Sequence, residues 1–111
     1  MGVNGREWAR MEKLKPHYEL PDIKAAFADP AKLNRSFVSK QGADALDMDD
    51  NEFVAVIQAL TLADFEKSMT SIADNKIWQD VYKPKAKGRQ LYVKFTRDAR
   101  QELFLISFKE A

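Results

Sequence analysis

The sequence predicts an α+β fold in which N-terminal helices pack on one face of a C-terminal antiparallel sheet. Helical spacing of apolar residues is confined to the chain up to Leu60, whereas alternation of apolar and polar residues dominates the rest. The connections between the alternating segments are too short for a crossover helix, so neighbouring strands should run antiparallel. Helices followed by a strand meander predict two layers around one core.

The first predicted helix begins at Pro21, because proline is favoured in the first turn of a helix. Ile23 and Phe27 follow at helical spacing, and the Asp29-Pro30 pair ends the helix. After it we expect a short extended piece over Arg35–Val38 and a further helical turn over Ser39–Leu46.

The clearest helix is predicted over Asp49–Leu60. Asp49 or Asp50 can cap its first turn, and Glu52 adds negative charge at the positive end of the helix dipole. The apolar residues at helical spacing form one stripe that must be buried. These residues are Phe53, Val56, Ile57 and Leu60.

Four strands are predicted in the remaining chain, where β-forming residues alternate between short turn-forming segments. They cover residues 65–72, 76–82, 90–96 and 102–109. Because successive side chains of a strand point to opposite faces, the helices should cover one set of residues in the last two strands. That set is Leu91, Val93, Phe95, Phe104, Ile106 and Phe108.

The opposite, uncovered side of the sheet is called the open face below. Alternation places Tyr92, Lys94 and Lys109 on this face. It leaves the side of Lys67 undecided, because Lys67 alternates in phase with both Phe65 and Met69.

Composition limits the possible chemistry. The chain has no cysteine, which excludes disulfides, thiolate nucleophiles and thiolate metal sites. His17 is the only histidine, which excludes a histidine zinc site and a histidine-dependent triad. No apolar run approaches the ~18 residues of a membrane span, and Met1–Trp8 lacks the apolar region of a signal peptide. We therefore expect a cytoplasmic protein with no metal, no membrane association and no small-molecule cofactor.

Residues Met1–Lys15 are polar and contain two glycines, which indicates a poorly ordered extension. Met11 is an alternative start of the folded unit. We therefore predict a disordered extension over residues 1–10 and a single domain over residues 11–111, a length sufficient for one core.

The near-neutral total charge hides two oppositely charged segments. Residues 76–111 carry nine cationic and four acidic side chains, whereas residues 42–75 carry eight acidic side chains and Lys67. A cationic segment suits a polyanion such as RNA. The acidic segment is either a solvated helix face or a surface that repels nucleic acid from the wrong side.

RNA can be cleaved without a metal when the 2′-hydroxyl attacks the adjacent phosphorus. The reaction needs a proton acceptor, a proton donor and positive charge beside the phosphorane. Lysine, tyrosine and glutamine are the groups that remain for this task, and lysine acts as a base only where burial or neighbouring charge depresses its pKa. Lysines on an open sheet face more often only add solubility.

Several strings of this sequence resemble the MqsR (motility quorum-sensing regulator) family of type II toxins. The resemblance covers nearly everything after residue 10, and Trp-Gln-Asp-Val-Tyr followed by Lys-Pro is its most specific part. The strings are Lys67-Ser68-Met69-Thr70, Ile77-Trp78-Gln79-Asp80-Val81-Tyr82-Lys83-Pro84, Gln90-Leu91-Tyr92-Val93-Lys94 and Ser107-Phe108-Lys109-Glu110.

The resemblance implies a RelE-like fold and a growth-arresting mRNA interferase, an endoribonuclease that cuts mRNA without the ribosome at GCU-type triplets. It also implies an MqsA-like antitoxin, which binds zinc and has a helix-turn-helix. The alternative is a subunit of the same fold that binds RNA or joins a repressor complex without cleaving. The triplet preference is put in doubt by three departures from the family. Position 83 is lysine where the family has arginine, the Lys85–Arg89 loop diverges, and the Asp98–Glu102 connection is longer.

The matching family positions imply a catalytic set of Lys67, Gln79, Tyr92 and Lys109. A second set of expected RNA-binding residues consists of Met69, Thr70, Lys83, Lys85, Lys87, Arg89 and Lys94. The lysines are candidates for charge stabilisation and proton transfer, Tyr92 for donating to a phosphate oxygen or stacking on a base, and Gln79 for hydrogen bonding to RNA.

Overall fold

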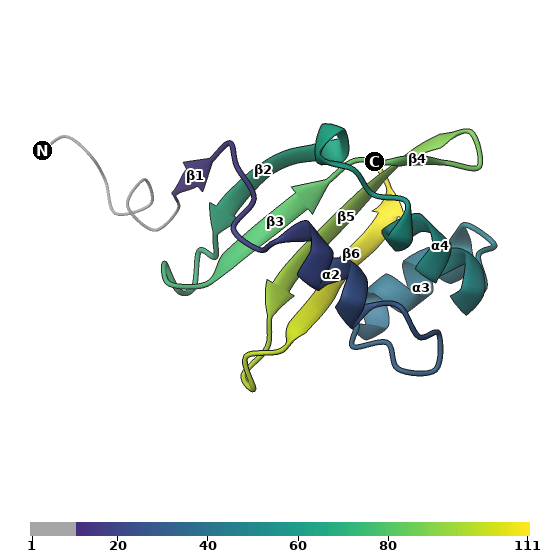
Figure 1. The fold of residues 1–111 in the computed structure, drawn as a ribbon, viewed down its shortest axis with the longest axis horizontal. Coiled ribbons are helices and arrows are strands. Elements are labelled where there is room, and N and C mark those ends of the chain that lie inside the picture. Colours follow the sequence, from purple (N-terminus) through teal and green to yellow (C-terminus); the bar gives the residue numbers. More distant parts are fainter. Residues whose placement is uncertain (1–10) are drawn as a thin grey trace, which may run out of the picture.

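The computed structural model describes residues 11–111, so the predicted disordered extension over residues 1–10 lies outside the described residues. Helices and an antiparallel sheet form the predicted α+β fold (Figure 1). The helices are α2 (Leu20–Ala26), α3 (Phe37–Ala45), α4 (Asp50–Gln58) and the short 3-10 helix η1 (Leu62–Asp64). No helix within residues 11–111 has the length and hydrophobicity needed to span a bilayer.

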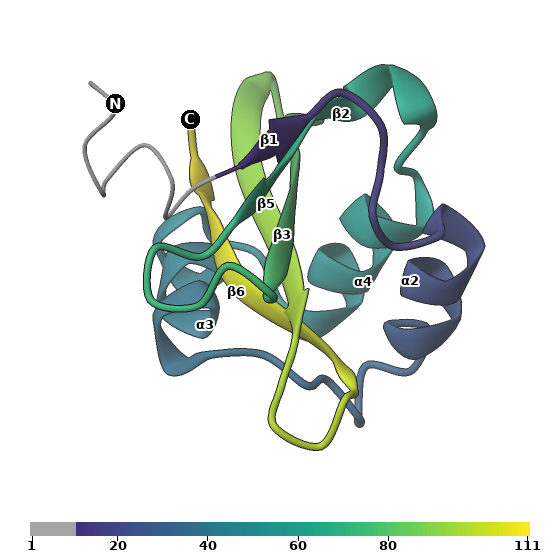
Figure 2. The ribbon, with the colours of Figure 1, turned by 90° about the vertical axis from the view of Figure 1, so that its left-hand side faces the viewer.

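The sheet contains six antiparallel strands, of which four were expected. They are β1 (Glu12–Lys13), β2 (Phe65–Thr70), β3 (Trp78–Tyr82), β4 (Lys85–Ala86), β5 (Arg89–Arg97) and β6 (Leu103–Glu110). Strands β1, β2, β3, β5 and β6 lie side by side in that order, and β4 pairs with the start of β5. Helices α2 and α4 lie on one side of this sheet, whereas α3 lies alongside β6 (Figure 2).

Both later helices begin at side-chain caps. Asp49 accepts a hydrogen bond from the Glu52 N–H while the Glu52 side chain accepts one from the Asp49 N–H, which confirms the predicted cap of α4. The Ser36 side chain accepts a hydrogen bond from the Ser39 N–H and so caps α3, and the expectation of an extended piece over Arg35–Val38 is therefore wrong for Phe37 and Val38. The serine cap satisfies a backbone donor that would otherwise be left unpaired at the helix start.

One apolar core lies between the helices and the sheet. Within the predicted stripe of α4, Phe53, Ile57 and Leu60 are buried and Val56 packs partly against the core. Strand β5 adds three fully buried side chains, which confirms the predicted covered face of this strand. They are Leu91, Val93 and Phe95.

The covered face of β6 differs from the prediction. Leu103 and Leu105 are buried in the core, whereas Phe104 and Ile106 are only half-buried. The strand pairing changes register between Lys94 and Phe95, so one extra residue of β6 stands opposite β5. Such a β-bulge reverses the alternation of side chains beyond it. Phe104 and Ile106 were therefore predicted on the wrong face, and Phe108 on the right one.

A glycine permits the close contact between α3 and β6. A Cβ atom at Gly42 would stand 1.7 Å from the backbone oxygen of Phe108. Any other residue would therefore force the helix away from the strand.

The N-terminal residues that the structure describes belong to the sheet. Glu12 and Lys13 of β1 pair with Met69 and Ser68 of β2. The Thr70 N–H also donates to the Met11 carbonyl over 2.8 Å. The expectation of a poorly ordered extension reaching Lys15 is therefore wrong for residues 11–13, because backbone pairing with β2 fixes them.

Candidate active site

The pairing register gathers lysines on the open face. Val81 of β3 stands between Lys67 of β2 and Lys94 of β5, and Ser107 of β6 continues the same row. The side chains of this row point away from the face that carries the Tyr82 side chain, which is in the core. The undecided side of Lys67 is thus settled by the sheet register, because Lys67 shares the face of Lys94.

Val81 is fully buried although it lies on the open face. The flanking Lys67 and Lys94 are themselves half-buried, which fits lysine stems that lie along an apolar side chain while their ammonium groups remain at the surface. The two lysines therefore flank one buried apolar residue on the open face.

Two ammonium groups lie near one phenol in the next row of the open face. Tyr92 and Lys109 are direct partners across β5 and β6, which confirms that both lie on the face predicted by alternation. Lys109 Nζ is 5.5 Å and Lys94 Nζ is 5.8 Å from the centre of the Tyr92 ring. These distances are typical of cation–π contacts. The two ammonium groups therefore lie beside the Tyr92 ring, whose hydroxyl is a hydrogen-bond donor.

Gln79 completes the predicted catalytic set on the open face. It pairs with Met69, which is two residues along β2 from Lys67. The set therefore spans four strands, from β2 to β6. With about 4.8 Å per strand and an offset of two residues along β6, the backbones of Lys67 and Lys109 stand roughly 16 Å apart, so both side chains have to extend over the sheet to reach one phosphodiester.

Glu12 also lies at this face, and sequence reasoning missed it. Its Oε2 atom is 3.3 Å from Lys67 Nζ, although the two residues are 55 positions apart in the chain. In the sequence, Glu12 follows Met11, the alternative start of the folded unit, and lies within residues 1–15, which were interpreted as a poorly ordered extension.

The predicted RNA-binding cations are not all brought to the catalytic set. Lys83 follows β3 beside Tyr92 and forms an ion pair with Glu66 at 3.0 Å. Arg89 forms an ion pair with Glu110 at 3.3 Å.

Lys87 is held by helix α4 and the turn before it. Its ammonium donates to the Asp47 carbonyl over 2.7 Å and forms an ion pair with Glu52 at 3.0 Å. The hydrogen bond from Lys87, followed by that from the Asp49 N–H, lowers the pKa of the Glu52 carboxyl. Lys87 therefore fastens the β4–β5 hairpin to the helix layer.

Met69 and Thr70 point to opposite faces of β2. Met69 lies on the open face opposite Gln79 and is 5 % exposed. Thr70 is fully buried, and its hydroxyl oxygen accepts a hydrogen bond of 2.7 Å from the Met11 N–H. Met69 therefore lies beneath the open face with almost no surface for RNA to contact, and Thr70 holds the N-terminal segment.

Asp80 anchors the two strands that carry Lys67 and Gln79. Its buried carboxylate accepts hydrogen bonds from the backbone N–H groups of His17 and Tyr18, at 3.0 and 2.9 Å, and from the Ser68 hydroxyl at 2.5 Å. A buried carboxylate needs such donors to offset its desolvation. Asp80 was not among the residues singled out from the sequence.

His17 lies apart from the open face. Its ring stacks on Trp78 at 5.2 Å, and its Nδ1 atom is 2.8 Å from Lys13 Nζ. Burial, followed by the nearby Lys13 charge, lowers the pKa of His17. Trp78 is two residues from Asp80 in β3, so its side chain, on which the His17 ring stacks, lies on the covered face of the sheet. The chemistry of the open face therefore has to proceed without imidazole from this residue.

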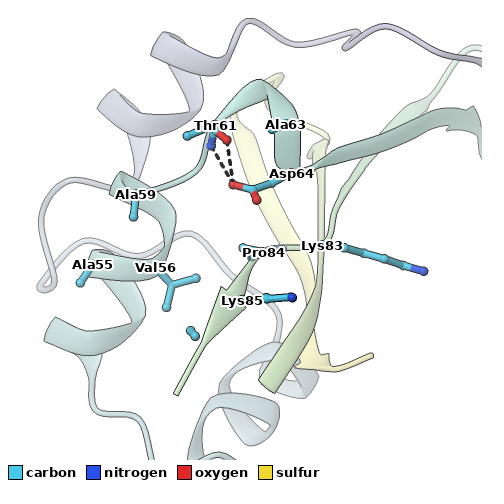
Figure 3. A pocket seen from close by; sticks show the side chains of 10 residues that line it. Ala55, Val56, Ala59, Thr61, Ala63, Asp64, Lys83, Pro84 and Lys85 are labelled. Carbon is cyan, nitrogen blue, oxygen red and sulfur yellow. Dashed lines mark hydrogen bonds between the residues drawn. The ribbon is translucent and has the colours of Figure 1, made fainter. Parts of the chain in front are cut away.

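A cavity of about 680 Å³ lies between α4 and the β3–β4 connection (Figure 3). Small apolar side chains line most of it, including Ala55, Ala59 and Ala63. Lys83 and Lys85 also line it, and the end of the Lys83 side chain extends away from the other lining residues (Figure 3). None of the four residues predicted to be catalytic lines this cavity. The candidate active site is thus an exposed sheet surface and not this cavity.

Comparison with known proteins gives two matches. The family model described as "Motility quorum-sensing regulator, toxin of MqsA" matches residues 15–110. A relative from Escherichia coli (strain K12), the mRNA interferase toxin MqsR, is 39 % identical over 101 residues. The match covers 90 % of this chain and 99 % of the relative.

Proposed function

The chain belongs to the motility quorum-sensing regulator family of toxins, and we propose that it is an endoribonuclease that arrests growth by cleaving messenger RNA. The relative named an mRNA interferase supports this activity. The observation that carries the proposal is the arrangement of Lys67, Lys94, Tyr92 and Lys109 on one open face. It combines positive charge with a hydroxyl donor at the surface, where a strand of RNA can lie.

The proposed reaction is metal-independent transfer of the phosphate to the neighbouring 2′-oxygen. The 2′-hydroxyl loses its proton and its oxygen bonds to phosphorus, while the bond from phosphorus to the 5′-oxygen breaks and that oxygen takes up a proton. The products are a 2′,3′-cyclic phosphate and a 5′-hydroxyl. Lys67 and Lys109 would stabilise the charge on the phosphorane, and Tyr92 would donate a hydrogen bond to a phosphate oxygen.

The RNA is proposed to cross the strands from Lys109 towards Lys67. Gln79, whose side chain is half-buried on the open face, would then contact a nucleotide next to the scissile phosphate. An amide reads hydrogen-bonding groups on a base edge. We propose a preference for GCU-type triplets and cleavage without the ribosome, both of which rest on the family resemblance.

The toxin family implies an antitoxin partner, since the matching model is described as the toxin of MqsA. We propose an MqsA-like antitoxin that binds zinc and has a helix-turn-helix. Because the proposed substrate is messenger RNA, we propose that the toxin acts in the cytoplasm.

Cleavage of a purified transcript in EDTA tests the proposed activity. The wild-type protein should yield discrete fragments that end in a 2′,3′-cyclic phosphate, because no metal takes part in the reaction. In cells, Lys67→Ala should relieve growth arrest while the purified variant keeps its thermal unfolding transition.

A mobility shift without cleavage would instead support the alternative, a subunit that binds RNA or joins a repressor complex. Cleavage that disappears in EDTA and returns with a divalent cation would contradict the proposed reaction. Full toxicity of Lys67→Ala would contradict the assigned site.

A further inference from the structure

The ion pair between Glu12 and Lys67 places a carboxylate at the edge of the candidate active site. Glu12 is the direct partner of Met69 across β1 and β2, so it shares the open face with Met69 and Lys67. The side chains of Lys67 and Glu12 are 33 % and 49 % exposed, so both are accessible to RNA. Glu12 therefore directly contacts Lys67, a residue of the proposed catalytic set.

We propose that Glu12 is the general base that removes the proton from the 2′-hydroxyl, while Lys67 stays protonated and stabilises the phosphorane. This inference rests on the proposed ribonuclease function and adds a residue that neither the family resemblance nor the sequence pattern indicated. It gives the two opposing tasks of the reaction to two side chains that are already in contact.

Geometry supports this division of tasks. The Lys67 ammonium has three protons, so it can donate to Glu12 and to a phosphate oxygen at the same time. A phosphate oxygen bound to it would lie about 2.8 Å from Nζ, next to the Glu12 oxygen at 3.3 Å. The 2′-hydroxyl belongs to the ribose that carries this phosphate, so it comes within reach of the carboxylate.

The charge states of the two residue types also favour the carboxylate. An ionised carboxylate only accepts hydrogen bonds, whereas an ammonium carries three protons and no acceptor. A carboxylate therefore accepts a proton at neutral pH without prior deprotonation. An ammonium has first to lose its proton, and it then no longer stabilises the phosphorane.

The proton balance closes within the site. The Glu12 carboxylate takes the 2′-hydroxyl proton and becomes a carboxylic acid, and the bond between the 2′-oxygen and phosphorus forms. The 5′-oxygen leaves with a proton supplied by the ammonium of Lys109 or by water. Exchange with solvent returns both groups to their starting states.

A second interpretation makes the opposite kinetic prediction. If Glu12 only neutralised Lys67 in the free protein, it would compete with RNA phosphate, and its removal would lower KM and leave kcat unchanged. If Glu12 is the base, its removal lowers kcat. In both cases loss of a negative charge leaves RNA binding as tight as before or tighter.

The test is single-turnover and steady-state cleavage by Glu12→Gln, with Glu66→Gln as the matched control. Glu66 forms an equivalent ion pair with Lys83 at 3.0 Å and belongs to the same strand as Lys67. We expect Glu12→Gln to lower kcat by about 100-fold, the usual range for loss of a general base. The control should remain within about threefold of wild type.

The pH dependence gives a readout that a structural role would not change. In the wild type, log kcat should rise over a range of pH, because protonation of the base stops the reaction, and Glu12→Gln should lose this rise. Glu12→Asp, which keeps a displaced carboxylate, should retain the rise and part of the rate. Neither variant changes the hydrogen bonds of the Met11 backbone with the Thr70 N–H and the Thr70 hydroxyl, which fix β1.

Three outcomes would each overturn the role of Glu12. The first is a wild-type kcat in Glu12→Gln, and the second is an equal loss of kcat in Glu66→Gln. The third is a wild-type rate that keeps rising above about pH 9, as a lysine base would require. A wild-type protein that binds RNA without cleaving it would overturn the proposed function, and this inference with it. Efficient wild-type cleavage together with an active Glu12→Gln would overturn this inference alone.

Discussion

The two faces of the sheet have different tasks although they share the same strands. On the covered side of β5, Leu91, Val93 and Phe95 are fully buried, whereas on the open side Tyr92 and Lys94 remain half-buried. The covered side chains gain stability by leaving water, and the open ones hold charge and hydroxyl groups at the surface. Similar substitutions on the two faces should therefore separate folding from function.

The largest expected effect is on the free energy of unfolding, and it distinguishes the two faces of the sheet at the bulge of β6. Leu105→Ala should lower the free energy of unfolding by about 3 kcal/mol, because a fully buried leucine is removed from the core. Ile106→Ala should cost about 1 kcal/mol, since this side chain is half-buried on the other face. Urea unfolding of both variants measures the difference. A larger loss in Ile106→Ala than in Leu105→Ala would contradict the bulge and restore simple alternation.

Removal of one hydroxyl from each face should give opposite outcomes. Tyr92→Phe should lower the cleavage rate about 100-fold, the usual effect of losing a hydrogen-bond donor to the transition state, with stability unchanged. Tyr82→Phe should leave cleavage intact. Initial rates on one transcript, together with thermal unfolding, test both variants. Normal cleavage by Tyr92→Phe would remove Tyr92 from the catalytic set.

The buried phenol of the covered face should make the protein sensitive to alkali. Burial, followed by the charges of Asp80 and Glu19, raises the pKa of Tyr82 to about 12. Between pH 10 and 12 the unfolded chain releases a proton that the folded protein retains, so stability falls as pH rises through this window. The loss should reach roughly 2 kcal/mol at about pH 11.5.

Tyr82→Phe provides the control for this pH effect. Within residues 11–111 no group forms a hydrogen bond with the Tyr82 hydroxyl, so its removal should leave stability at neutral pH unchanged or slightly increased. Urea unfolding at neutral and alkaline pH should show a smaller alkaline loss in the variant. The same loss in both proteins would assign the effect to other groups.

The smallest expected effect concerns RNA affinity. Lys94→Ala on the open face should reduce the slope of log affinity against log salt by about 0.7, the value for one contact with a single-stranded phosphate. Lys87→Ala should leave the slope unchanged, because Lys87 is engaged by Asp47 and Glu52 at the helix layer. Binding titrations of a non-cleavable RNA at several salt concentrations provide the measurement. A reduced slope in Lys87→Ala would return Lys87 to the RNA-binding surface.

Sequence reasoning predicted those features that depend on near neighbours in the chain. The Asp49 cap of α4 and its buried stripe follow from local spacing. The open-face positions of Tyr92 and Lys109 follow from the period of two in strands β5 and β6, with the bulge falling between these residues and Phe104. The prediction of the face of Phe104 and Ile106 was wrong because one extra residue in β6 reverses the alternation of side chains. No turn-forming residue marks this bulge in the sequence.

The amino-acid sequence by itself determined the α+β class, the main helices and strands, and the types of side chain available for chemistry. Only the tertiary structure decided which of these side chains meet. Glu12 and Lys67 lie 55 residues apart, and their contact depends on the pairing of a two-residue edge strand with β2. Asp80 likewise gathers donors from His17, Tyr18 and Ser68. Local propensity has no information about such pairings, because their stability comes from burial and hydrogen bonds between distant segments.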